Sequence, residues 1–105
     1  MKTNLLSLLV IALFLVNCTS TPKDEKTLSG LDKTKFQTVV NGDSTDLYVL
    51  KNASGMEVAI TNFGGRIVSV MVPDKTGKMI DVVLGFDSIS DYINVPSDFG
   101  ATIGR

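Results

Sequence analysis

The chain has 105 residues, a formal net charge of −1, one cysteine and no histidine. This length provides at most one small domain, and the lack of a basic block argues against a nucleic-acid partner. A single cysteine forms no internal disulfide. The lack of histidine removes the commonest general acid and base. The lack of a second cysteine excludes thiolate catalysis within the fold and cysteine-bound zinc.

The first element is an apolar run from Leu5 to Val16, interrupted only by Ser7 and preceded by Lys2. A transmembrane helix needs about 20 apolar residues, so this run is too short to span a bilayer. Its length, its position and the preceding lysine are typical of a helical, cleavable export signal. We therefore predict that residues 1–17 are a signal peptide, the alternative being a buried core helix.

Cys18 follows the apolar run, and Leu15-Val16-Asn17-Cys18 resembles a bacterial lipobox. In such signals the cysteine is acylated and becomes the new N-terminus, so the resemblance implies that Cys18 is a lipid-attachment site. The protein is then exported as a membrane-anchored lipoprotein. The alternative is an incidental cysteine within a signal that is cleaved a few residues later, which would leave a periplasmic protein.

The next segment, residues 18–35, is rich in Thr, Ser, Lys and Asp and has few apolar residues. Such a composition buries too little apolar surface to offset the entropy lost on ordering. The sequence therefore predicts a flexible tether between the membrane anchor and a folded part, residues 36–105.

Apolar residues alternate with other residues through most of the folded part, which is the period of a β-strand. Short links containing Asn-Gly, Ser-Gly and Pro-Asp favour antiparallel hairpins. Two of the alternating runs are partly apolar on both faces, which is typical of strands covered on both sides. The sequence predicts an all-β fold with strands near residues 36–40, 46–51, 56–61, 66–72 and 79–84.

After the last predicted strand, Asp87 or Ser88 is placed to cap a short helical turn that runs through Ile93. Carboxylates are present, but no catalytic pair is evident. We expect structural roles in turns, strands and helix starts for Asp74, Asp81, Asp87 and Asp91. The sequence also lacks the spacing of a phosphate-binding loop, so no catalytic, cofactor-binding or metal-binding residue is predicted.

Five blocks of the sequence, in order, resemble the aldose 1-epimerase (galactose mutarotase) family. They are Thr-Asn-Phe-Gly-Gly-Arg-Ile-Val-Ser at 61–69, Val-Pro-Asp-Lys-Thr-Gly at 72–77, Asp-Val-Val-Leu-Gly-Phe-Asp at 81–87, Asp-Tyr at 91–92 and Phe-Gly-Ala-Thr-Ile-Gly-Arg at 99–105. The resemblance implies a large antiparallel β-sandwich with a sugar cleft, of which residues 36–105 would form the N-terminal part. It also implies interconversion of the α and β anomers of free hexoses such as galactose and glucose, without a cofactor.

Family members use a histidine as the acid at the ring oxygen and a glutamate as the base at the anomeric hydroxyl. The resemblance places these residues, and a sugar-contacting Asn-Arg pair, downstream of Arg105. We therefore expect an inactive fragment of such an enzyme, whose full-length parent takes a hexose as its partner. The alternative is a non-catalytic carbohydrate-binding or structural surface lipoprotein.

Overall fold

The computed structural model describes residues 26–104 of the chain. The predicted signal peptide and Cys18 lie outside the described residues, so both stay predictions. No helix in residues 26–104 is long and apolar enough to cross a membrane.

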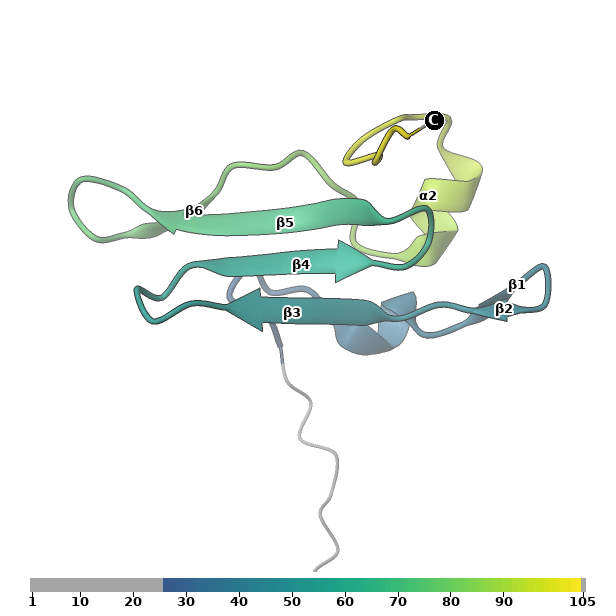
Figure 1. Cartoon of the computed structure of the whole chain (residues 1–105), viewed down its shortest axis with the longest axis horizontal. Helices are drawn as coiled ribbons and strands as arrows, with labels where there is room; N and C mark the ends of the chain where they lie inside the picture. Colours follow the sequence, from purple (N-terminus) through teal and green to yellow (C-terminus); the bar gives the residue numbers. More distant parts are fainter. Residues whose placement is uncertain (1–25, 105) are drawn as a thin grey trace, which may run out of the picture.

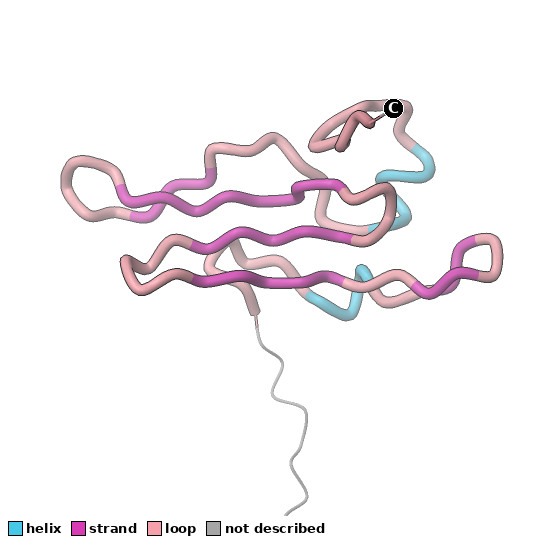
Figure 2. Tube along the Cα trace, viewed as in Figure 1, coloured by secondary structure: helices cyan, strands magenta, loops and turns pink. Residues whose placement is uncertain are grey.

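The described part consists of short antiparallel strands with two helical turns (Figures 1 and 2). A two-stranded sheet pairs β1 with β2, and a four-stranded sheet has the order β3-β4-β5-β6. The all-β class predicted from the sequence is confirmed. In chain order the elements are η2 (Lys33–Phe36), β1 (Val39–Val40), β2 (Asp43–Ser44), β3 (Leu47–Lys51), β4 (Glu57–Thr61), β5 (Arg66–Pro73), β6 (Met79–Asp81) and α2 (Ile89–Asn94).

The first predicted strand, 36–40, is wrong in its first half. Asp32 caps a 3-10 turn there, because its Oδ1 accepts a hydrogen bond from the backbone N–H of Thr34 at 2.9 Å. The strand character that remains is β1, which pairs with β2 across Asn41 and Gly42. Both residues have positive φ (52° and 89°), as expected of an Asn-Gly hairpin turn.

The last predicted strand ends three residues early, at Asp81. The Asp81 Oδ1 accepts hydrogen bonds from the backbone N–H groups of Val70 and Val83, both at 3.0 Å. The Asp81 side chain thus takes the place of a backbone carbonyl as the acceptor for the Val70 N–H of β5. The strand pairing between β5 and β6 ends there. The helical turn is confirmed, with Ser88 as its N-cap.

One face of the four-stranded sheet carries the core. Buried side chains alternate along β4, and their partners on β5 include the buried Ser69 and Met71. A register shift in β5 opposite Ala59 adds one residue, so that Val68 and Ser69 are both buried. The core cluster consists of Leu31, Phe36, Leu47, Ala59, Val68, Ile89 and Tyr92.

The predicted flexible tether is wrong over its last residues. Leu31 belongs to the core, and Thr27 is buried. The backbone N–H of Leu28 donates to Oε1 of the buried Glu57 at 2.7 Å. We call residues 27–31 the N-terminal strap. The strap packs because Leu31 enters the core and because Glu57 of β4, far away in the sequence, accepts a hydrogen bond from its backbone. The local composition alone does not provide these contacts.

The opposite face of the sheet is open in the described part of the chain. Figure 1 shows η2 passing behind β3, and η2 and α2 contact each other on that covered side. The expectation that strands are covered on both sides is therefore met on one side only within residues 26–104.

Candidate functional site

The link between β4 and β5, residues 62–65, organises one end of the sheet. Its Asn62 accepts a hydrogen bond through Oδ1 from the backbone N–H of Asp46 (2.9 Å) and donates through Nδ2 to the Ser44 carbonyl (3.0 Å). Gly64 and Gly65 have φ of 73° and 59°, which glycine adopts without strain. The link therefore joins the β2–β3 connection to the start of β5.

The C-terminal segment, residues 97–102, lies against the start of β5, as Figure 2 shows. The Thr102 hydroxyl donates to the Gly65 carbonyl at 2.6 Å, and the Ile67 N–H donates to the Gly100 carbonyl at 2.9 Å. A Cβ on Gly100 would lie 2.0 Å from the Ile67 carbonyl oxygen. Only glycine permits this close approach of two backbones.

Arg66 completes the contact between β5 and this segment. Its Nη1 donates to the carbonyls of Ser97 (3.2 Å) and Phe99 (3.1 Å). The guanidinium carbon lies 5.3 Å from the centroid of the Tyr92 ring, within the range of a cation–π contact. Charged N–H groups thus satisfy two backbone carbonyls that no strand pairs.

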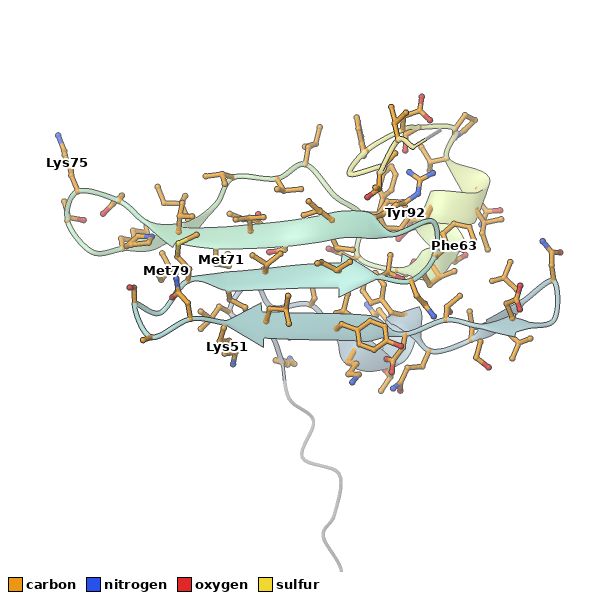
Figure 3. The ribbon with its side chains drawn as sticks, in the orientation of Figure 1. Lys51, Phe63, Met71, Lys75, Met79 and Tyr92 are labelled. Carbon is orange, nitrogen blue, oxygen red and sulfur yellow. The ribbon has the colours of Figure 1, made fainter. Side chains whose placement is uncertain are left out.

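An aromatic cluster supports Arg66. Phe86 packs against Tyr92 edge-on at 5.0 Å and against Phe99 at 5.6 Å between ring centroids. The Phe86 N–H donates to the Tyr92 hydroxyl at 3.2 Å. Figure 3 shows Tyr92 and Phe63 at this end of the sheet, with Lys75 at the opposite end. We call Arg66, Gly100, Thr102 and these aromatic contacts the clamp.

A shallow hollow lies beside the clamp, between the β1–β2 hairpin and the β4–β5 link. Its polar side chains bond within the fold: Thr45 Oγ1 donates to the Phe36 carbonyl (2.7 Å), and both amide atoms of Asn62 are engaged. The hollow is lined by Val40, Asn41, Asp43, Ser44, Thr45, Asn62, Phe63 and Gly64. It pairs no acid with a base.

The carboxylates singled out in the sequence lie in separate parts of the fold. Asp74 closes the β5–β6 turn, where hydrogen bonds from the Thr76 hydroxyl and N–H hold its pKa below its ordinary value. Asp81 ends β6, and Asp91 Oδ2 accepts from the Ser88 hydroxyl at 2.7 Å. Asp87 lies between β6 and α2. Within residues 26–104, no cluster of three or more His, Cys, Asp or Glu side chains is arranged to hold a metal ion.

Sequence reasoning missed the clamp. It gave no role to Arg66 or to its contacts with Ser97 and Phe99. A signal was present, because the first and last of the five resembling blocks contain Arg66 and Phe99. Those two blocks meet in space through Gly65, Arg66 and Ile67.

The family model described as aldose 1-epimerase matches residues 46–105. The chain belongs to the aldose 1-epimerase family. The match covers β3 to α2 and the whole clamp, but not the N-terminal strap or the β1–β2 hairpin.

Curated relatives carry the same descriptions. A probable aldose 1-epimerase of Arthroderma benhamiae is 29% identical over 90 residues, which are 82% of this chain and 20% of that protein. Mouse galactose mutarotase is 33% identical over 73 residues, or 70% and 21% of the two chains. Bovine galactose mutarotase is 40% identical over 50 residues, or 48% and 15%. No solved structure matches. The chain spans about a fifth of the length of these relatives.

Proposed function

We propose that these residues form the N-terminal scaffold of an aldose 1-epimerase that interconverts the α and β anomers of free hexoses such as galactose and glucose. The family match over residues 46–105 carries this proposal. The names of the relatives, galactose mutarotase among them, support the substrate class.

Mutarotation requires a proton donor at the ring oxygen and a proton acceptor at the anomeric hydroxyl, because the ring must open and close again. The 105 residues include no histidine. The carboxylates of Asp74, Asp81 and Asp91 are occupied by hydrogen bonds at three separate places in the fold. We therefore propose that these 105 residues alone do not catalyse the reaction.

We propose that this chain contributes by holding its backbone at residues 97–102 in a fixed position. The clamp fixes the path of residues 97–102 relative to β5 through the four hydrogen bonds described above. Preorganised backbone lowers the entropy lost when a catalytic geometry is assembled. In this proposal the scaffold acts through geometry, and none of its side chains transfers a proton.

A chimera tests the family function. Residues 46–105 would replace the matching region of mouse galactose mutarotase, and optical rotation of fresh α-D-galactose would be followed. We expect mutarotation well above the buffer rate from a soluble, cooperatively melting chimera. A folded chimera without activity would contradict the proposal. The 105-residue chain alone, measured beside it, should leave the buffer rate unchanged.

A non-catalytic carbohydrate-binding or structural surface lipoprotein is the second candidate. The observation that favours it is the shallow hollow, which Phe63 lines together with Asn41, Asp43 and Asn62. An aromatic residue beside a few polar groups is a usual lining of a small-molecule site. Calorimetric titration with galactose separates the two candidates, because saturable binding by the chain, lost in Phe63→Ala, would favour the second.

Export and anchoring belong to the same proposal. Acylation of Cys18 would hold the folded part at a membrane, since each buried CH₂ contributes about 0.8 kcal/mol. Cys18→Ser should abolish incorporation of labelled palmitate and move the protein to the soluble fraction. Labelling that persists in Cys18→Ser would overturn this part.

A further inference from the structure

A second hollow, which we call the lysine hollow, lies where the start of the N-terminal strap meets β3. Its volume is about 360 Å³, and it is lined by Lys26, Thr27, Lys33, Val49 and Lys51. The three lysines come from separate places in the chain, namely the residue before the strap, η2 and the end of β3. Figure 3 shows Lys51 at the edge of the sheet where the described chain begins. Three positive charges around one hollow repel one another unless negative charge lies among them.

Two carboxylates offset part of this positive charge. Lys51 Nζ lies 3.3 Å from Glu57 Oε2, and Lys33 Nζ lies 3.7 Å from Asp46 Oδ1. Neither contact has the geometry of a hydrogen bond, so neither carboxylate takes up the N–H donors of its lysine. Three lysines less two carboxylates leave a net charge of +1 around the hollow.

The hydroxyl in the lining is already engaged within the strap. Thr27 Oγ1 shares a hydrogen bond with Ser29 Oγ and accepts one from the Leu31 N–H, both at 2.8 Å. The ammonium groups are therefore the donors that the hollow offers to a ligand. Lysine is a usual partner of phosphate, to which it presents a compact point charge. Three such groups can each reach a different oxygen of a tetrahedral phosphate, whereas a carboxylate offers only two oxygens.

We propose that the lysine hollow binds a phosphate group through the ammonium groups of Lys26, Lys33 and Lys51. Lys26 and Lys33 precede the region of the family match, which begins at residue 46, so this inference is independent of the proposed enzymatic function. The net charge is small, and the Lys33 and Lys51 side chains are 44% and 57% exposed. We therefore expect weak binding, with a dissociation constant on the order of 1 mM.

A phosphate group can come from a free phosphate ion or from a lipid headgroup. Lys26 is eight residues after Cys18, and a fully extended chain of that length spans at most about 28 Å. If Cys18 is acylated, as proposed above, this length is the farthest that Lys26 can lie from the anchored residue. Lipid headgroups are then within reach of the hollow, so both sources are tested.

Amide chemical shifts test the proposal in the full 105-residue chain, held in maltoside micelles. Phosphate is exchanged for chloride at constant ionic strength, so that general screening stays the same. The Thr27 N–H should shift saturably with phosphate. Lys26→Gln combined with Lys33→Gln should weaken the binding about tenfold. Lys51 stays in place in this variant because it pairs with Glu57.

The matched control is Lys75→Gln combined with Lys78→Gln. It removes the same charge from the β5–β6 turn, which is remote from the hollow, and should change the dissociation constant less than about twofold. An equal loss of binding in this control would show that net charge alone is responsible and would overturn the site. Binding that survives the loss of both Lys26 and Lys33 would overturn it as well.

Vesicles distinguish the two sources. The Leu28 N–H reports on the docked strap because it donates to Glu57, and its hydrogen exchange is measured in phosphatidylcholine vesicles with and without phosphatidylglycerol. Slower exchange with phosphatidylglycerol, lost in Lys26→Gln with Lys33→Gln, would assign the hollow to a lipid headgroup. A saturable shift with inorganic phosphate and no effect of phosphatidylglycerol would assign it to the free ion. No response to either would overturn the proposal.

Discussion

At the scale of single residues, Glu57 links the N-terminal strap to the sheet. Its carboxylate is 1% exposed on the covered face of β4. Oε1 accepts from the Leu28 N–H at 2.7 Å, and Oε2 lies 3.3 Å from Lys51 Nζ, in an ion pair without a well-directed hydrogen bond. A buried carboxylate is tolerated only with such partners, so strap and sheet depend on each other.

Replacing Glu57 should therefore loosen the strap before the sheet. Glu57→Ala removes the acceptor for Leu28 and leaves a cavity, and we expect a loss of about 2–3 kcal/mol in the free energy of unfolding. Glu57→Gln keeps an acceptor oxygen and should cost about 1 kcal/mol. Urea titration measures both, and hydrogen exchange should accelerate at Leu28 in the alanine variant. Equal losses in the two variants would show that the Leu28 hydrogen bond contributes nothing.

Gly100 is the second decisive residue. Its φ of +66° disfavours any side chain, and a Cβ would lie 2.0 Å from the Ile67 carbonyl oxygen. Gly77 has a φ of +87° but open space around it, which makes it the matched control. We expect Gly77→Ala to cost about 1 kcal/mol from the backbone alone, and Gly100→Ala to cost about 3 kcal/mol or more because backbones must also separate. Thermal unfolding of both variants checks the difference, and equal melting temperatures would contradict it.

At the scale of elements, side chains decide where the elements end. Asp32 caps η2, Asp81 ends β6, and Ser88 caps α2. Asp74 has the same function in the β5–β6 turn, where its Oδ1 accepts from the N–H groups of Thr76 (2.7 Å) and Lys78 (3.0 Å). Apolar alternation therefore sets the register of these strands, and short acidic or hydroxyl side chains set their lengths.

The Asp74 turn gives a pH prediction. The hydrogen bonds from Thr76 hold the pKa of Asp74 below its ordinary value of 3.8. A lowered pKa means that the stabilisation is complete above about pH 4 and is lost as the pH falls through the lower, folded-state pKa. The protection of the Lys78 N–H against hydrogen exchange, taken relative to the intrinsic rate at each pH, should fall on going from pH 5 to pH 2. Asp74→Asn should remove this pH-dependent loss of protection. An unchanged profile in that variant would contradict the assignment.

At the scale of the whole molecule, the sequence predicted what depends on neighbouring residues. The alternation in 56–61 and 66–72, the Asn41-Gly42 turn and the Ser88 cap all act locally, and all are found. The strap and the clamp were not predicted, because both depend on contacts across the sequence. Leu28 bonds to a carboxylate 29 positions away, and Arg66 bonds to a carbonyl 33 positions away. Neither the composition nor the periodicity of the sequence indicates which distant residues form such pairs.

The clamp joins the start of β5 to residues 97–102, and Arg66 is its centre. Arg66→Ala removes both carbonyl contacts and the contact with Tyr92. We therefore expect the free energy of unfolding to fall by about 2 kcal/mol. Arg66→Lys keeps the charge but lacks the planar guanidinium, and about half of the loss should remain. Exchange at the Ile67 N–H, which donates to Gly100, should accelerate more than tenfold in Arg66→Ala, while amides between β3 and β4 stay protected.

The control for this prediction is Lys75→Ala, at the opposite end of the sheet (Figure 3), which should leave the Ile67 N–H unchanged. The distinction lies in where protection is lost. A sheet that merely became less stable would lose protection everywhere, since all of its amides would exchange through the same global unfolding. Selective exchange at Ile67 instead requires residues 97–102 to leave β5 while the strands stay paired. Uniform acceleration in Arg66→Ala would therefore rule out a separate clamp and make Arg66 an ordinary contributor to the core.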